Sequence, residues 1–374
     1  MIVSLISRAT GAQRRDEAPE AAHRRRLPRR AAWLCVALTA AILGLIVISG
    51  AIGSVQVQPV EAAQIVIGHL IPGMPWMADG SVTVLQDQAV WQFRLPRTLL
   101  AALAGAGLAL AGALMQVTVR NPLAEPYILG VSSGASVGAV LVIVLGSAAL
   151  GGLSMNVAAF AGALVACACV WALARKDGAL SPTRMILSGV ALGTLLSAVT
   201  SYLTISTDAQ NVVSVLFFLL GSVSAATMSS LIGPAVALVI SGTVAALLAR
   251  SLNALMTGDE SAASLGIDAG RLRGLMLVIA SLLTGAVVSV AGGIGFVGLV
   301  IPHVARIAVG ADHRRLLPVT VLGGAVFLMV ADLLARTVAT PTEIPLGILT
   351  AFVGAPFFLW LMRRSGAERA GFGR

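Results

Sequence analysis

Few residues of this chain have side chains that could catalyse a reaction, and they are scattered. Asp332 lies inside an apolar stretch, where an ionised carboxylate costs about 3 kcal/mol and is by default a candidate proton-relay or substrate group. Arg336 follows one helical turn later, so the two side chains are placed to form an i, i+4 ion pair. The spacing favours the ion pair, and a proton-relay role stays open.

A metal site has little support. His303 and His313 bracket the end of one apolar segment, and Asp312 lies beside the second histidine, but a zinc site needs a third converging ligand. We expect His313 to lie in an exposed loop. The three cysteines lie within apolar segments and are expected to be buried thiols: Cys35, Cys167 and Cys169. The sequence therefore predicts no metal site.

Nucleotide-binding patterns are also weak. Residues 293–298, GIGFVG, fit G-x-G-x-x-G, but a dinucleotide loop needs a strand before it and a helix after it. The flanks here are apolar, and we interpret the stretch as a glycine break between two helices, as found in transporters. A P-loop needs Gly-Lys-Ser/Thr, and the single lysine, Lys176, follows an arginine. We therefore expect no ATP hydrolysis and no enzymatic activity from this chain.

Three arginines stand apart from the other basic residues. Arg94 and Arg97 precede one apolar segment, and Arg336 ends another. Their side chains could simply reach from helix ends to the membrane surface. Alternatively, they form a cationic rim that docks the acidic side chains of a partner or an anionic substrate.

These residues must be held by membrane-spanning helices. The chain is 57% hydrophobic and 11% charged, with a mean hydropathy of +0.94, whereas soluble domains carry roughly 25% charged residues. Ten segments approach the roughly 20 apolar residues that cross a bilayer. They lie near residues 31–53, 97–117, 128–148, 155–174, 183–205, 231–250, 273–291, 294–310, 317–335 and 345–362. The sequence predicts an all-α polytopic membrane protein, with residues 211–226 as a re-entrant or interfacial helix.

The distribution of charge orients this chain. The net charge is +9, but the basic residues sit at segment ends rather than on one patch, so nucleic acid is not indicated. With ten crossings, all basic residues except Arg94, Arg97 and Arg336 fall on the side of the N-terminus. The positive-inside rule then predicts a multi-pass protein of the cytoplasmic membrane with both termini in the cytoplasm.

The segments outside the spans follow from this arrangement. Residues 1–30 are polar and are expected to form a disordered basic arm, residues 31–364 a transmembrane domain, and residues 365–374 a short cytoplasmic tail. Residues 54–93 are expected to form a long external loop. The largest inner loop, 251–272, is polar enough for a short surface helix between two glycines, with acids near its N-terminus.

Small residues recur every fourth position in two rows. In lipid, helices gain little from hydrophobicity against one another, and small residues let their backbones approach closely. The rows therefore predict a tightly packed helix bundle. They are Ala101, Gly105, Ala109 and Ala113, and then Gly130, Gly134 and Gly138.

Taken together, several stretches of the sequence resemble the FecCD family, the permease subunits of type II ATP-binding-cassette (ABC) importers. They are RLPRTLLAALAGAGLALAGALMQ, RNPLAEPYILGVSSGA, GDESAASLGID, AGGIGFVGLVIPHVAR, GADHRRLLP and ADLLARTVATPTEIPLGILTAFVGAPFFLWLM. The resemblance covers about residues 31–364. It implies the fold of such a permease, with ten spans in each of two paired chains.

The resemblance also implies partners. Two cytoplasmic ATPase subunits bind beneath the permeases and use ATP and magnesium, and an extracytoplasmic substrate-binding protein docks above. Membrane lipid surrounds the chain. The pairing of two identical chains or of two different permeases stays open. No cofactor is expected in this chain itself.

Three groups of residues match family motifs and are assigned roles through the resemblance. The ATPase-coupling loop comprises Gly258, Asp259, Glu260, Ala262, Ala263, Leu265 and Gly266. The residues that dock the binding protein are Arg94, Arg97 and Arg336. The inner gate region is Leu180, Ser181, Pro182 and Thr183, where Pro182 departs from the hydroxyl residues common in relatives.

The function implied is import of an iron chelate, with a ferric siderophore as the first expectation and haem or cobalamin as the alternative. An ion-coupled secondary transporter would need buried acids at mid-membrane, and only Asp332 offers itself. An intramembrane enzyme would need a converging nucleophile, base or metal, which the sequence does not provide.

Overall fold

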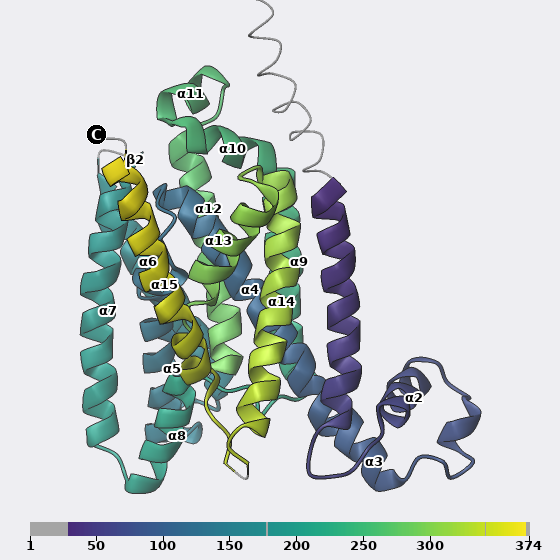
Figure 1. The fold of residues 1–374 in the computed structure, drawn as a ribbon. Coiled ribbons are helices and arrows are strands. Elements are labelled where there is room, and N and C mark those ends of the chain that lie inside the picture. The colour runs from purple at the N-terminus through teal and green to yellow at the C-terminus, as the bar shows by residue number, and fades with distance from the viewer. Residues whose placement is uncertain (1–28, 177–178, 341, 372–374) are drawn as a thin grey trace, which may run out of the picture.

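The structure is a computed structural model that describes residues 29–176, 179–340 and 342–371. Apart from one short hairpin, the elements are helical and form an upright bundle (Figure 1). Most of the expected N-terminal arm and the last three residues of the expected tail lie outside the described residues.

The elements follow one another in a simple order. They are an N-terminal helix (Arg29–Ala51), α2 (Pro59–Leu70), η1 (Pro75–Met77), α3 (Val84–Gln88), η2 (Ala89–Arg94), α4 (Leu95–Val119), η3 (Pro126–Leu129), α5 (Val131–Leu145), η4 (Ala148–Leu150), α6 (Met155–Ala174), β1 (Arg175–Lys176), β2 (Ala179–Leu180), α7 (Pro182–Ile205), α8 (Ala209–Leu220), η5 (Ser229–Leu231), α9 (Ile232–Leu247), α10 (Ala249–Thr257), α11 (Asp259–Ser264), α12 (Ala269–Ala291), α13 (Val297–Val309), α14 (His313–Thr337) and α15 (Leu346–Gly371).

The expected transmembrane architecture is confirmed. Seven helices of the described chain are long and apolar enough to span a membrane. The shorter apolar helices α5 and α13, together with α15, complete the ten expected segments. The extra apolar segment forms α8, which has only 12 residues and is too short to cross a bilayer core about 30 Å thick.

Helix α4 is the centre of the bundle, and its close neighbours approach through glycines. A β-carbon on Gly105 would collide with the carbonyl oxygen of Gly324 in α14, and one on Gly112 would collide with Gly298 in α13. Backbone approaches of this kind are available only to residues without a side chain. Leucines on α4 fill the remaining contacts; Leu100, for example, is fully buried.

A second close contact joins α5 to α6. β-carbons on Gly134 and Gly138 would meet the carbonyl oxygens of Gly162 and Ala158 in α6. Gly130 precedes α5 with a φ of 69° and lies against Gly193 of α7. The two rows of small residues thus lie at two separate sets of helix crossings.

Residues 54–93 are folded rather than a long loop, which corrects the expectation from sequence. Pro59 begins α2, and Glu61 closes a capping box with Gln58, an arrangement that satisfies donors at a helix start. A small apolar cluster that includes Ile65 and Val90 packs this segment together. The sequence pattern was misleading because the prolines here start helices instead of ending them.

The two ends of the bundle are chemically different and are named here by their elements. The α11 end carries α10 and α11 and is uppermost in Figure 1, and the α2 end carries α2, α3 and the turn between α14 and α15. Helix α4 runs between them and is visible diagonally through the middle of the bundle (Figure 1).

Helix packing at Gly105 can be tested with a single methyl group. Gly105→Ala should destabilise the protein by about 1–3 kcal/mol, the usual cost of forcing extra volume into a packed site. Gly44→Ala is the matched control, because Gly44 is also helical but has open space around its α-carbon. Denaturant unfolding in detergent micelles measures the difference, and equal stability of the two variants would disprove the tight crossing.

Candidate functional site

The α2 end holds a group of charged side chains that we call the arginine cluster: Arg94, Arg97, Asp332, Arg336 and Glu343. Arg97 donates from Nε to Asp332 Oδ1 and from Nη1 to Glu343 Oε1, at 2.8 Å each. Arg336 Nη2 lies 3.5 Å from Asp332 Oδ2, which confirms the expected i, i+4 pair. Arg336 also donates to Ser49.

The guanidinium group of Arg94 donates its hydrogen bonds to backbone carbonyl oxygens. Its Nη1 donates to the carbonyl oxygens of Gly50 at 2.7 Å and Ala51 at 3.2 Å, and its Nη2 to Val55 at 2.6 Å. These carbonyls lie at and beyond the C-terminal end of the N-terminal helix, where a cation is stabilised by the helix dipole. Arg94 is 7% exposed, so the structure gives it an internal role at this helix end.

The arginine cluster is therefore nearly neutralised from within. Asp332 is buried and bridges Arg97 and Arg336, and Glu343 binds the outer side of Arg97. Three arginines against two carboxylates leave a net formal charge of +1. A partner carboxylate would compete with Glu343, which is the exposed member of the cluster. The docking role of the three arginines stays a prediction.

A cavity of about 630 Å³ opens over this cluster. Its lining combines the three arginines and Glu343 with Phe93 and Ser224. A surface of this composition suits a partner that presents both acidic and apolar groups.

The second notable region is a break between α12 and α13. Helix α12 ends at Ala291 and α13 begins at Val297, and Phe296 has a φ of 67°. No strand precedes the glycines, so the interpretation as a broken helix is confirmed and the dinucleotide loop is excluded. The end of α8 meets the break, because Ser222 N donates to Ala291 O at 2.9 Å and Gly293 N to Phe218 O at 3.2 Å.

Two side chains satisfy two further backbone donors of the break. Glu125 accepts a hydrogen bond from Phe296 N, and the Tyr127 hydroxyl accepts one from Ile294 N, both at 2.6 Å. Such partners are required because an unpaired backbone group away from water is costly. Sequence reasoning missed both residues. The available signal was an acid in a proline-flanked turn between two apolar segments.

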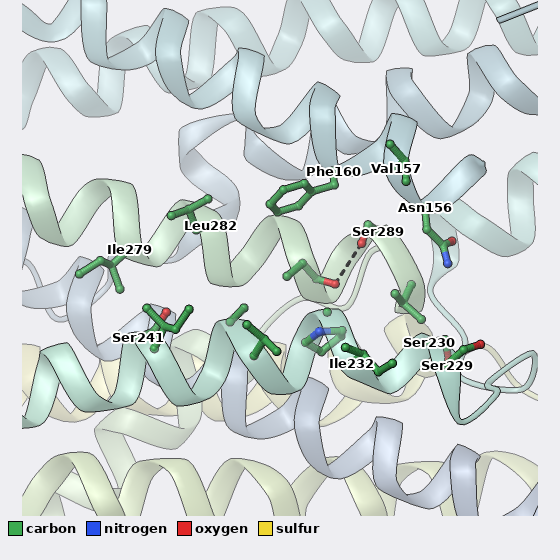
Figure 2. A pocket seen from close by; sticks show the side chains of 17 residues that line it. Asn156, Val157, Phe160, Ser229, Ser230, Ile232, Ser241, Ile279, Leu282 and Ser289 are labelled. Atoms are coloured by element: carbon green, nitrogen blue, oxygen red, sulfur yellow. Dashed lines mark hydrogen bonds between the residues drawn. The ribbon is translucent and has the colours of Figure 1, made fainter. Parts of the chain in front are cut away.

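Apolar cavities adjoin the break and the side of the bundle. One of about 620 Å³ lies between Phe296 and Phe352 of α15. Another, of about 580 Å³, is lined by residues of α6, η5, α9 and α12; Phe160 of α6, Ile232 of α9 and Leu282 of α12 point into it (Figure 2). Ile232 is 63% exposed, so this cavity opens to the outer surface of the chain. Neither lining contains a charged side chain.

The α11 end carries the expected coupling loop as two short helices. The expected surface helix is α11, and α10 precedes it; Gly258 separates them with a φ of 124°, and Gly266 follows α11 with a φ of 75°. Ala262 is buried against the bundle. The exposed members of the loop are Asp259, Glu260, Ala263, Leu265 and Gly266. The loop thus offers an outward surface of two acids, one leucine and small residues.

Asp259 differs from Glu260 because it binds arginines of its own chain. It accepts hydrogen bonds from Arg273 of α12 and from Arg120 at the end of α4. The bond from Arg273 holds the pKa of the Asp259 carboxyl below its usual range, so the group stays ionised at neutral pH. Sequence reasoning placed Asp259 in the loop but did not find either partner.

The expected gate residues lie where the hairpin joins α7. Leu180 is in β2, whose backbone pairs with β1 through Arg175. Ser181 precedes the first turn of α7, Pro182 occupies its first position, and Thr183 is exposed. The side chains of Leu180 and Pro182 lie outside the described ones, and the gate role stays a prediction.

The histidines hold no metal cluster. Within the described ranges, no group of three or more histidine, cysteine or acidic residues is placed to bind a metal ion. The expectation of an exposed His313 is wrong, since its side chain is buried, with Nδ1 2.6 Å from Asn253 Oδ1. Asp312 caps α14, and its side chain also accepts a hydrogen bond from Asn253 of α10. This places His313, the next residue, against α10.

Comparisons with known proteins agree with this architecture. The FecCD transport family matches residues 40–364. The chain is 43% identical over 318 residues to the cobalamin import system permease protein BtuC of Halobacterium salinarum, covering 82% of this chain and 85% of that protein. It is 40% identical over 292 residues to the hemin transport system permease protein HmuU of Yersinia pestis, covering 76% and 87%.

A solved structure of the metal-chelate type of ABC transporter, in an inward-facing conformation, has the same fold. It superposes with a TM-score of 0.75 at 32% identity and covers 88% of this chain and 98% of that one. This polytopic, non-catalytic subunit therefore belongs to the FecCD transport family of ABC importer permeases.

Proposed function

We propose that the chain is the permease through which a cobalamin- or haem-type metal chelate enters the cell. The observation that carries this proposal is the 43% and 40% identity, over most of both chains, to permeases named for cobalamin and for hemin. These relatives favour the macrocyclic chelates over the ferric siderophore that the sequence alone put first. The apolar cavities beside the helix break are compatible with a large, weakly charged cargo.

We infer that the α11 end faces the cytoplasm. The basic residues around Arg120, Arg271 and Arg315 lie at this end, and the positive-inside rule places such residues in the cytoplasm. The α2 end then faces outward. A substrate-binding protein would dock over the arginine cluster, and two ATPase subunits, with ATP and magnesium, would bind around α11.

Transport in this proposal requires a second permease chain, identical or different. The chain performs no bond chemistry. It supplies a helix bundle with two arrangements, and its partners shift the population between them through the difference in their affinity for each. The break between α12 and α13 is the kind of discontinuity that transporters use at the substrate pathway.

The assembled transporter in liposomes tests the function directly. With binding protein outside and ATP inside, we expect uptake of cyanocobalamin or hemin to exceed that of a ferric hydroxamate at least tenfold. Vesicles without the ATPase, or with a non-hydrolysable ATP analogue, are the controls. Accumulation of cargo in those controls would contradict an ATP-driven importer. Faster uptake of the ferric hydroxamate would instead favour a siderophore as the cargo.

The coupling surface can be tested at Glu260. Glu260→Arg reverses the only exposed acid of α11 that has no arginine of its own chain bound to it among the contacts described here. We expect uptake and stimulated ATP hydrolysis to fall at least tenfold while the permease stays folded. Asp79→Arg, the same charge reversal at the α2 end, serves as the control. Wild-type uptake by the Glu260 variant would show that coupling to the ATPase does not depend on this loop.

The docking surface can be tested by releasing Arg97. Glu343→Gln raises the net charge of the arginine cluster from +1 to +2 and frees Arg97 Nη1. If a partner carboxylate replaces Glu343, binding-protein affinity at low salt should rise about fivefold, equivalent to about 1 kcal/mol. Arg97→Gln should lower it. If the affinity for the binding protein at low salt is the same in both variants as in the wild type, the arginine cluster only stabilises the permease.

A further inference from the structure

We propose that Asp259 is a positioning residue that fixes the coupling helix α11 to the inner ends of α4 and α12. A displacement of α11 then also moves α4, the central helix of the bundle, instead of being absorbed by the flexible loop. This inference rests on the proposed contact between α11 and the ATPase. It assigns to Asp259 a role different from that contact.

The loop needs such a link because the backbone that joins α11 to its neighbours is flexible. Helix α11 has only six residues and lies between Gly258 and Gly266, both at positive φ angles. Glycine without a side chain leaves the backbone free to pivot at both ends. Ala262 of α11 is buried, and Asp259 joins α11 to the rest of the bundle through side-chain hydrogen bonds.

The carboxylate of Asp259 holds three elements together. Oδ1 accepts hydrogen bonds from Arg273 Nη2 at 2.6 Å and from Arg120 Nη2 at 2.7 Å, and Oδ2 accepts one from Arg273 Nη1 at 3.0 Å. The bond pair with Arg273 is the two-pronged geometry that fixes direction as well as distance. Arg273 Nε also donates to Thr118 O of α4 at 3.2 Å. Helices α4, α11 and α12 therefore meet at one group.

The burial of Arg273 makes this contact more than a surface ion pair. Its side chain is 4% exposed, whereas that of Asp259 is 48% exposed. Exposed ion pairs contribute little, but a buried cation that loses its partner is strongly destabilised. Asp268, in the same loop, provides the contrast: its bridge to Arg271 joins two side chains that are 55% and 90% exposed.

Helix α4 can carry a displacement from the α11 end of the bundle to the α2 end. Helix α4 (Leu95–Val119) has 25 residues and so spans about 37 Å, from its inner end beside Arg120 to its outer end near Arg97. Its glycine contacts with α13 and α14 leave no room for local bending at the crossings. A displacement of its inner end therefore moves neighbouring helices as well, and its outer end belongs to the arginine cluster.

The assembled transporter with Asp259→Asn tests the proposal. The change keeps the size of the side chain but removes its charge, so the variant should still bind the ATPase subunits, because Glu260, Ala263 and Leu265 on the exposed face of the coupling loop are unchanged. We expect the ratio of binding-protein-stimulated to basal ATP hydrolysis, and the uptake per ATP, to fall at least tenfold. Asp259→Glu should restore part of both, and Arg120→Gln should give a smaller loss than Asp259→Asn.

Asp268→Asn is the matched control, because it removes the same charge from the same loop and asparagine keeps the helix cap. It should behave as wild type. If Asp259→Asn fails to fold because Arg273 is left unpaired, the double variant Asp259→Asn/Arg273→Met removes that cation. The double variant should fold and remain uncoupled.

The outcomes separate this proposal from the proposed function. Wild-type coupling in either variant that folds would overturn the positioning role, while wild-type uptake and the Glu260→Arg result would still support the importer. Loss of ATPase binding in Asp259→Asn would also overturn it, because Asp259 would then be part of the ATPase contact itself.

Discussion

The structure depends on one constraint of the lipid environment, which is that every backbone polar group within the bundle needs a partner in the protein. An unbroken helix meets this requirement by itself. The break between α12 and α13 does not, and other elements supply partners for it. Glu125 and Tyr127 accept hydrogen bonds from Phe296 N and Ile294 N, and the end of α8 pairs with Gly293 N and Ala291 O. The short helix α8 and the turn before α5 are therefore needed where they are.

The same constraint favours ion pairs at the ends of the bundle over its middle. The described ion pairs of the spanning helices gather at the two ends, around Asp332 at one and Asp259 at the other. Each carboxylate is shared by two arginines from different elements or turns. Between these ends, contact is made by small residues such as Gly105 and Gly134. Charge fixes the ends of the helices, and backbone-to-backbone packing fixes their crossings.

This division bears on how cargo is recognised. The two cavities beside the middle of the helices are apolar. The described cavities that carry charged side chains lie at the ends of the bundle. A bundle built this way has few groups with which to distinguish one large chelate from another by charge or hydrogen bonding. In the proposed importer, selection among cargoes therefore falls mainly to the binding protein, and the permease provides a passage and a means of opening it.

The sequence by itself determined the local and repeating features of this protein. Hydropathy located the ten helical segments and the shorter α8, the spacing of glycines located the crossings, and short motifs identified the family, because each of these signals is contained within a few helical turns. The arm at residues 1–28 lies outside the described part of the chain, and the folded segment 54–93 was taken for a loop because its helices are short and begin at prolines.

Only the tertiary structure decided which side chains meet. Arg97 and Asp332 are 235 positions apart, and Arg120 and Asp259 are 139 apart, so no helical periodicity relates them. The inward turn of His313, the occupation of Arg94 by backbone carbonyls and the role of Glu125 at the helix break have the same origin. In each case the partner of a polar group is set by how separate helices pack. Where the group is buried, as Asp332 and His313 are, water is not there to replace that partner.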